Sequence, residues 1–578
     1  MKLPRRKTAL GRFLARVRRS TKPQPSPGLS STALTTSHFD SLPPKLLAKV
    51  LNLVANEAQQ SRIASYATVN KSWQSFFEVK TFQSLFIEQD DLENFERIVV
   101  NKRRQYVKHI WLRIDLHEAT TTYKVPPRPS TTFLSKMGQL ILPCQRLGHV
   151  WGPATEDCTF TMSICRLWRI LSKWETRSGE SSQGLTLELM ADKPTPKTKL
   201  YPYKDYSATE KTDSYKEYLA TGSIESYKSS KDVHSVYVNL YELDKNLGPI
   251  FTNWWRGVLN DLFGFRPLSL GYSKNHEVWH NGDYEIPQLP KVPVVTKFLT
   301  RKPQFREIHA SALDKIIQSL PCVENISIER WRSPVLAREQ HWCKDAAVPF
   351  GISLPPSIKT LSLYGETSYV FNSWSADMVN TMALANALQQ YGKHLENLSV
   401  SHLIDAKDFF SAFWPTNSDS MTESLPEWHH LRTLSLTSEI LTTDTKQDTN
   451  NLLCAAARAA KKMPNLQLLE LWNGKKKQAC VFRYRVAASV NAITWLGTHV
   501  DTPDRQVIEA WNKTSMARGR SDLRAFAIRL DCEEIISAGT VLRYLDLRSQ
   551  IMHPVSGYRT AWEQLTGILN PDGSAEGL

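Results

Sequence analysis

A six-residue pattern, apolar-x-x-apolar-x-apolar, recurs at nearly equal intervals along the second half of the chain and constrains the fold more than any other feature. Five copies begin at residues 323, 358, 395, 431 and 466, so that successive starts differ by 35, 37, 36 and 35 residues. They read VENISI, IKTLSL, LENLSV, LRTLSL and LQLLEL. Because 41% of the residues are hydrophobic, any window fits the pattern about 7% of the time, and the regular spacing rather than a single match indicates a repeat. VKHIWL from Val107 and LRYLDL from Leu542 are two further candidate copies.

Helical spacing precedes several of these motifs. Leu313, Ile316, Ile317 and Leu320 fall at i, i+3, i+4 and i+7, with Ser311 as a candidate N-cap. The stretch NNLLCAAARAAKKMP predicts a second helix, which the proline ends. A helix followed by a short strand, repeated along the chain, predicts an α/β fold built as a strand-helix solenoid.

One face of the predicted strands carries small hydroxyl side chains. Successive residues of a strand point to opposite faces, so the residue between two buried positions should face outward. A row of serines edged by Tyr364 and Trp472 could receive a peptide, because aromatic anchors often dominate such contacts. The alternative is that serine is merely tolerated on a solvent-facing strand. The predicted target-binding residues are Ser327, Glu329, Ser362, Tyr364, Ser399, Ser435, Glu470 and Trp472.

A separate apolar segment lies near the amino end, between Leu42 and Trp73. Pro43 and Pro44 suit the first turn of a helix, and apolar residues follow at helical spacing as far as Val54. One or two further short helices are predicted from the apolar residues that resume at Ile63. A unit of about 40 residues is near the lower limit for folding alone, so its apolar stripes require cover from the rest of the chain or from a second protein.

The order of these residues, from Leu42-Pro43 to the terminal Val-x-x-x-Trp, resembles an F-box, the helical module that docks on the Skp-type adaptor of cullin ubiquitin ligases. The segment departs from the family in lacking the usual Asp-Leu at the start of the second helix. The resemblance implies that the adaptor-binding residues are Leu42, Pro43, Leu47, Val50, Leu51, Ile63, Val69 and Trp73.

The repeat region resembles an irregular leucine-rich repeat with a longer unit than usual. Together the two resemblances imply a fungal-type F-box protein, the substrate-recognition subunit of a Skp-cullin-F-box ubiquitin ligase that binds target proteins through the repeats. Such a subunit is not an enzyme; its partners are the adaptor, the cullin ligase and a protein target. The alternative is a leucine-rich-repeat-like interaction scaffold that is not assembled into a ligase and uses the helices only to cap its own repeats.

Charge is concentrated at the amino end. Residues 1–39 hold nine basic residues and no acidic one, which leaves +6 of the net charge of +15 for the other 539 residues. This arm could be disordered, a nuclear-localisation cluster or a mitochondrial presequence. Nucleic-acid binding through the arm is a further alternative, although the modest charge of the rest of the chain does not favour it.

The expected domains are a disordered basic tail (1–38), an F-box helical module (39–82), the first part of the repeat region (83–192), a flexible insertion (193–232), an irregular leucine-rich-repeat-like domain (233–555) and a C-terminal tail (556–578).

The sequence offers no motif for bond chemistry. It contains no phosphate-binding GxxxxGK[ST], dinucleotide-binding GxGxxG, GxSxG or HExxH pattern. The eight cysteines form no CxxC pair and no compact Cys/His cluster, so neither a metal site nor a cofactor is expected. No apolar run is long enough to span a membrane, and we expect a cytoplasmic and/or nuclear protein.

Overall fold

The computed structural model describes most of the repeat region and the N-terminal helices. The described residues are 42–57, 60–116, 153–175, 184–192, 213–222, 259–260, 262–273, 284–285, 287–302, 304–367, 371–372, 374–375, 378–414, 425–442, 446–487, 491–499, 504–519, 523–535 and 537–565. The basic tail predicted for residues 1–38 lies outside them, as does most of the segment predicted to be a flexible insertion.

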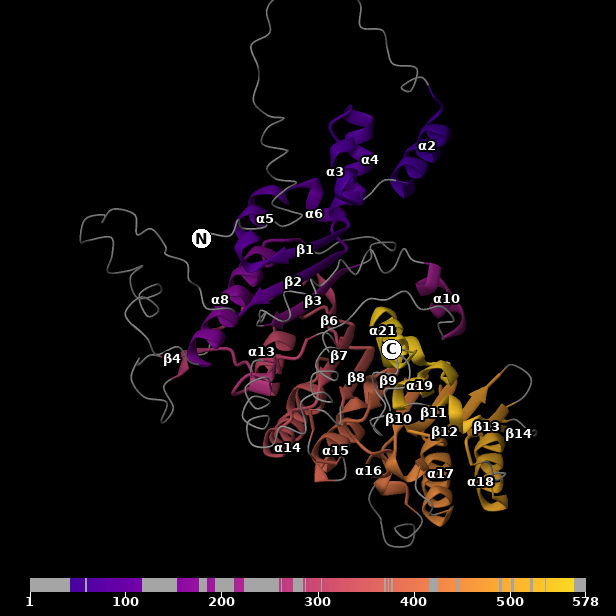
Figure 1. Cartoon of the computed structure of the whole chain (residues 1–578). Coiled ribbons are helices and arrows are strands. Elements are labelled where there is room, and N and C mark those ends of the chain that lie inside the picture. Colours follow the sequence, from indigo (N-terminus) through magenta and orange to yellow (C-terminus); the bar gives the residue numbers. More distant parts are fainter. Residues whose placement is uncertain are drawn as a thin grey trace, which may run out of the picture.

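A single open sheet of twelve strands forms the centre of this mixed α/β structure (Figure 1). The order of the strands in the sheet follows their order in the chain. All neighbouring pairs are parallel except β11–β12 and β12–β13. The strands are β1 (Ser84–Glu88), β2 (His109–Asp115), β3 (Leu185–Asp192), β6 (Val295–Thr300), β7 (Asn325–Trp331), β8 (Thr360–Glu366), β9 (Asn397–Ser401), β10 (Thr433–Thr437), β11 (Leu468–Lys475), β12 (Gln478–Val486), β13 (Asn491–Gly497) and β14 (Leu523–Arg529); β4 (Tyr272–Ser273) and β5 (Tyr284–Glu285) form a separate pair.

The five regularly spaced motifs are confirmed as neighbouring parallel strands, β7 to β11. Their central apolar residues are in register across the sheet: Ile326, Leu361, Leu398, Leu434 and Leu469 stand side by side. The early motif VKHIWL also supplies a strand, β2. The period of about 36 residues therefore measures one step from strand to strand.

The interpretation of LRYLDL as a further strand is wrong. Leu542–Tyr544 form a 3-10 helix, which lies against the sheet and not within it. Leu542 and Leu545 are three residues apart, a spacing that fits one turn of a 3-10 helix as well as it fits the strand motif. Before this segment the chain has already turned back at the β11–β12 hairpin, and β12, β13 and β14 extend the sheet instead.

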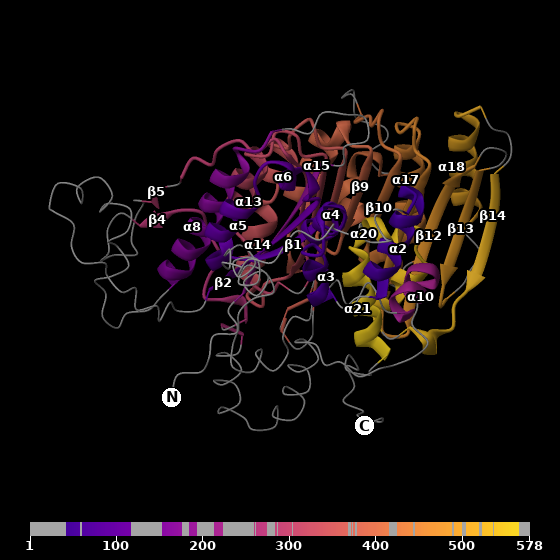
Figure 2. The same cartoon turned by 90° about the horizontal axis from the view of Figure 1, so that it is seen from above.

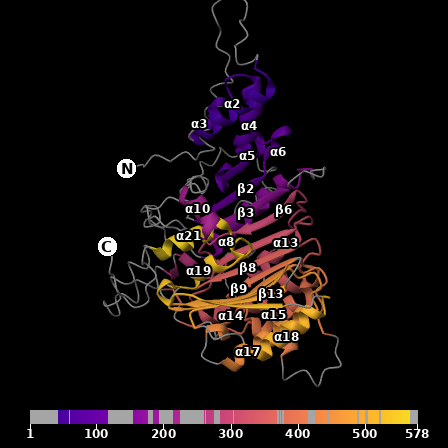
Figure 3. The same ribbon diagram turned by 90° about the vertical axis from the view of Figure 1, so that its right-hand side faces the viewer.

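Helices cover one face of the sheet and bury the apolar side of its strands. Figure 3 shows α13, α15, α17 and α18 on this side. The predicted helical spacing is confirmed in α13, where Leu313, Ile316 and Ile317 are buried. The N-cap is His309 and not Ser311, since the ring of His309 accepts a hydrogen bond from the Ser311 backbone N–H. Besides an N-terminal helix described below, the helices that contribute to this main core are α5 (Leu92–Ile98), α8 (Pro153–Leu171), α13 (Ala310–Gln318), α14 (Leu336–Asp345), α15 (Met382–Tyr391), α16 (Ala406–Phe409), α17 (Lys446–Ala460) and α18 (Arg505–Met516).

Three N-terminal helices extend beyond the first strand of the sheet (Figure 1). They are α2 (Pro44–Glu57), α3 (Gln60–Tyr66) and α4 (Lys71–Phe82). Asn70 caps α4, because its side chain accepts a hydrogen bond from the Trp73 backbone N–H at 2.9 Å. Phe82, the last residue of α4, is fully buried in the core of the sheet and so joins the helices to it. The short α6 (Lys102–Tyr106) contacts α4 next to this junction.

The C-terminal segment returns across the other face of the sheet (Figure 3). It comprises α19 (Ala538–Val541), the 3-10 helix, α20 (Arg548–Ile551) and α21 (Pro554–Leu565). A helix from the predicted insertion, α10 (Asp213–Thr221), packs on α21, where Tyr215 and Tyr218 contact the ring of Tyr558. The predicted boundary between residues 555 and 556 falls inside α21, so a separate C-terminal tail does not begin there.

Candidate functional site

The N-terminal helices enclose a small apolar cluster of their own. Leu51, Ala55 and Phe77 are buried in it. The ring of Trp73 lies 5.6 Å from the ring of Phe77 and 6.1 Å from that of Tyr66, centroid to centroid. Trp73 is therefore half-buried within its own module and not completely enclosed.

The structure places the predicted adaptor-binding residues on different sides of this module. Leu51 is only 3% exposed and points into the cluster, so its prediction as an accessible contact is wrong. A helix that packs on α4 must turn one stripe inward, and Leu51 lies in that stripe of α2. Pro43 and Val69 are exposed, and the half-buried residues are Leu42, Leu47, Val50, Ile63 and Trp73.

Two exposed leucines were missed by the sequence interpretation of this surface. Leu46 is 48% exposed and Leu53 is 62% exposed. With Val50 between them, they fall at i, i+4 and i+7, which is one face of α2. Helical spacing could have identified this stripe, but it lies directly beside the inward stripe and periodicity alone does not say which of two adjacent stripes packs on the module.

The predicted target-binding row is covered, and the expectation that it forms an open surface is wrong. All but one of its side chains are buried beneath or beside the C-terminal segment, and Ser327 is half-buried. The exposed fractions are 2% for Glu329, 3% for Ser362, 2% for Tyr364 and 0% for Ser399, Ser435, Glu470 and Trp472. Tyr364 and Trp472 pack in one apolar cluster with Val541, Leu542, Leu545, Ile551 and Met552 of the covering segment.

The two carboxylates of the row bind the backbone of this segment. Glu470 accepts hydrogen bonds from the N–H groups of Asp546 and Leu547, both at 3.0 Å, and from Nε of Arg483 at 2.7 Å. Glu329 accepts one from the N–H of His553 at 2.6 Å. Buried carboxylates need such donors, because desolvation without them costs several kcal/mol, on the order of 2–7 for a neutral polar group and more for an ion.

The serines of the row differ in their contacts. The hydroxyl of Ser362 donates to the carbonyl of Ile551 at 3.1 Å. The hydroxyls of Ser399 and Ser435 are buried without a hydrogen-bond partner. Small side chains at these positions leave room for the covering segment, so their size and not their polarity matters here.

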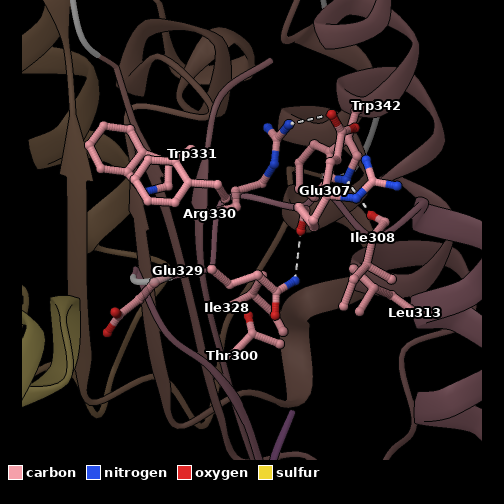
Figure 4. Close-up of a pocket in the computed structure, with 12 residues that line it drawn as sticks. Thr300, Glu307, Ile308, Leu313, Ile328, Glu329, Arg330, Trp331 and Trp342 are labelled. Atoms are coloured by element: carbon pink, nitrogen blue, oxygen red, sulfur yellow. Dashed lines mark hydrogen bonds and ion pairs between the residues drawn. The ribbon is translucent and has the colours of Figure 1, made fainter. Parts of the chain in front are cut away.

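A buried cluster of charged residues ties β7 to α14 (Figure 4). Arg330 donates two hydrogen bonds of 2.8 Å to Glu339, lies 3.6 Å from Glu307 and stacks 3.9 Å from the centre of the Trp342 ring. Figure 4 shows Arg330 pointing toward Trp342 while Glu329, the preceding residue, points to the opposite face. The cluster borders a cavity of about 20 Å³, which is room for about one water molecule.

The two carboxylates beside Arg330 have opposite pKa shifts. Burial favours the neutral acid of Glu339, but Arg330 and Arg332 outweigh burial and lower its pKa to about 2. Burial raises the pKa of Glu307 to about 7, because Arg330 compensates it only in part and the charge of Glu339 opposes its ionisation. The contribution of Glu307 to stability is therefore lost as the pH rises toward neutrality, whereas that of Glu339 is lost only in acid.

A chain of polar side chains crosses the first three strands. Nδ1 of His109 lies 3.4 Å from the hydroxyl of Ser84, and Nε2 lies 3.0 Å from Glu188. Both oxygens of Glu188 also accept hydrogen bonds from Arg301, at 2.6 and 2.5 Å. Since Arg301 already neutralises Glu188, this arrangement is a structural link between strands and gives no basis for an activated serine.

Metal-ligating side chains do not gather in the described part of the chain: no three His, Cys, Asp or Glu residues are grouped as ligands. Within the same residues, no helix combines the length and the apolar character that crossing a membrane requires.

Comparison with known proteins identifies one matching family model. It describes a family of unknown function (DUF6546) and matches residues 353–553. No curated protein matches the chain. The matched stretch contains seven of the twelve strands of the sheet, β8 to β14, and the covering segment as far as the end of α20. The chain is similar to this family over that stretch, and the N-terminal helices lie outside it.

Proposed function

We propose that the protein is the substrate-recognition subunit of a Skp-cullin-F-box ubiquitin ligase. Helices α2 to α4 bind the Skp-type adaptor, and the sheet with its helices carries the surface for target proteins. The subunit performs no bond chemistry itself; it raises the effective concentration of a target near the ubiquitin-carrying part of the ligase. A cytoplasmic and/or nuclear location belongs to the same proposal.

The observation that supports the adaptor contact best is the exposed apolar stripe of α2. Leu46, Val50 and Leu53 lie on a helix that extends beyond the sheet, and Val69 is 57% exposed at the end of the turn before α4. Burying each such side chain is worth about 1.5–3 kcal/mol. Association itself costs about 4–15 kcal/mol, so these residues can bind only as the centre of a larger interface.

Target binding requires a surface other than the row of serines. The C-terminal segment already fills that face, with backbone hydrogen bonds to Glu470 and Glu329. The proposal therefore moves the target contact from these residues to surfaces that the chain itself leaves uncovered.

An adaptor pull-down tests the proposal. The double variant Leu46→Asp, Leu53→Asp should recover the adaptor at least about tenfold less well than the wild type, since it places two charges in the proposed interface. Both side chains are exposed, so the variant should keep the wild-type unfolding temperature. The matched control is Met516→Asp on α18, which is 61% exposed at the other end of the sheet. Equal recovery of the adaptor by all three proteins would refute the proposed contact.

A second candidate is an interaction scaffold whose helices only cap the sheet. The contacts of α4 favour it: Phe82 is buried in the sheet core, and Glu78 lies 2.6 Å from Arg103 of α6. A truncation that begins at residue 70 removes α2 and α3 but keeps α4. If those two helices are a cap, the unfolding temperature of the remainder should fall; if they are a docking module, only adaptor binding should be lost.

A further inference from the structure

Within the part of the chain that the structure describes, strand β14 leaves one edge of the sheet without a neighbouring strand. It pairs with β13 on one side and is the last strand of the sheet on the other (Figure 2). Six of its seven residues are exposed, and Leu523 is half-buried. Alternate backbone N–H and C=O groups of an edge strand point away from its only neighbour, so β14 offers a row of hydrogen-bonding groups to another strand.

The side chains of β14 are apolar and basic. Phe526 and Ile528 are 48% and 47% exposed. They stand beside Thr494 and Leu496 of β13, on the face where Leu496 packs with the C-terminal segment. The covering segment thus stops before the last strand and leaves these two apolar side chains at the margin of an existing apolar cluster.

Arg524 and Arg529 flank this apolar pair. Neither has a salt bridge or side-chain hydrogen bond among the described residues, whereas many other arginines of the described chain are paired with carboxylates. Edge strands are usually protected by charged side chains, a proline, a bulge or a covering element, and the two arginines are the only such device in β14. β14 contains no proline and no acidic residue, and its outer edge pairs with no other strand of the sheet.

We propose that β14 is a docking edge for an extended acidic segment of a partner protein, which adds to the sheet as a thirteenth strand. Backbone hydrogen bonds would supply affinity without sequence preference. Apolar side chains of the partner opposite Phe526 and Ile528, and carboxylates near Arg524 and Arg529, would supply specificity.

Charge argues against a second copy of the same chain at this edge. Pairing two β14 strands would gather four arginines, and the strand carries no carboxylate to balance them. Like charges at a strand pair are destabilising. The assignment goes beyond the proposed ligase function and holds whether or not α2 to α4 bind an adaptor.

Fluorescence anisotropy with the full chain and a labelled synthetic peptide tests the proposal. The probe is a short peptide of alternating glutamate and valine; its counterparts are the same peptide with lysine for glutamate and the same peptide with alternate backbone amides methylated. The acidic peptide should bind, and affinity should fall at least about tenfold for either counterpart. Added salt should weaken binding, because the arginines are exposed.

Variants of β14 locate the site. Arg524→Glu with Arg529→Glu, and separately Phe526→Thr with Ile528→Thr, should each weaken binding of the acidic peptide at least about tenfold. The matched controls are Arg505→Glu, whose side chain is 93% exposed on α18, and Met516→Thr, which should bind as the wild type does. Unchanged unfolding temperatures would show that the variants are folded.

Three results would overturn the assignment. The first is absence of binding to the acidic peptide. The second is binding that survives backbone methylation or the β14 substitutions. The third is a wild-type dimer in sedimentation that Phe526→Thr with Ile528→Thr dissociates, since a second copy would then occupy the edge. Adaptor recovery by the β14 variants should equal that of the wild type, so failure here and failure of the ligase proposal are distinguishable.

Discussion

At the scale of single residues, burial decides the role of the polar side chains more than their chemistry does. Ser362 and Ser435 occupy equivalent places on β8 and β10, yet only Ser362 has a hydrogen-bond partner. Glu307 and Glu339 flank the same arginine, yet their pKa values shift in opposite directions. In each pair the sequence shows the same residue type, and the surroundings separate the two.

Replacing Ser435 by alanine should leave stability unchanged or raise it. Its buried hydroxyl has no partner, and an unsatisfied polar group costs about 1–3 kcal/mol, part of which alanine recovers. Ser362→Ala is the matched control and should lower the free energy of unfolding by about 1 kcal/mol, because it removes a hydrogen bond. Urea unfolding measures both. Equal losses in the two variants would contradict this account of the row.

Stability should depend on the protonation of Glu307. Its pKa is raised from 4.5 to about 7 in the folded protein, so the folded state binds this proton more tightly than the unfolded state. The contribution of this tighter proton binding to the free energy of unfolding is fully present below pH 4.5 and is lost as the pH rises to about 7. In Glu307→Gln this decrease in the free energy of unfolding should disappear. Urea unfolding across that pH range measures it.

Glu93→Gln is the control for this pH dependence, since the side chain of Glu93 is 85% exposed, and it should keep the wild-type profile. Glu339 acts in the opposite sense: its contribution is lost only as the pH falls from 4.5 toward about 2. A Glu307→Gln profile parallel to that of the wild type between pH 4.5 and 7 would show that Glu307 does not titrate there.

At the scale of secondary-structure elements, the covering segment is an integral part of the fold. It supplies apolar side chains that are almost fully buried, and the family match ends at residue 553, close to where α20 ends. The same face that would serve as a target groove in an open repeat array is here an internal interface. The two edge strands of the sheet differ within the described residues: α4 packs against β1, whereas no other strand pairs with the outer edge of β14.

Weakening the link between Glu470 and the covering segment should loosen that segment before the rest of the sheet. Glu470→Gln keeps an acceptor but removes the charge that Arg483 and two backbone N–H groups bind. We expect the free energy for opening the covering segment to fall by about 2–3 kcal/mol. Hydrogen exchange at the Asp546 and Leu547 amides measures it.

The matched control is Glu533→Gln, which removes an exposed contact with Lys477 and should leave the free energy of unfolding nearly unchanged, because solvent screens this contact. Protection of the Asp546 and Leu547 amides that is the same in both variants would show that Glu470 does not anchor the segment.

At the scale of the whole molecule, sequence order and spatial order coincide. Each strand of the sheet lies beside the sheet strands that precede and follow it in the chain. The steps from β7 to β11 follow the spacing of about 36 residues, whereas much longer segments join β2 to β3 and β3 to β6. The C-terminal segment supplies contacts of long range in the sequence, because it crosses back to β2, β3 and β7. Helix α10, from the middle of the sequence, packs on the same segment. Because this segment packs on the face that the other helices leave free, apolar side chains are buried on both faces of the sheet.

The sequence by itself determined the strands β7 to β11, their spacing and some of the covering helices, such as α13 and α17, because hydrophobic periodicity is a local property that each segment carries alone. It also indicated two or three short amino-terminal helices with more apolar surface than they can bury. The sequence did not predict strands β12 to β14, because they follow a hairpin and do not continue the spacing of 36 residues.

Only the tertiary structure decided which outward-facing residues meet water. A strand has the same alternating pattern of apolar and polar residues whether its second face is covered by solvent or by a distant part of the chain. The cover of Ser399, Ser435 and Glu470 comes from residues 538–565, far away in sequence, and the inward turn of Leu51 comes from its packing on α4. Burial of this kind results from contacts between segments that are remote in sequence, and the pattern of one segment alone does not predict those contacts.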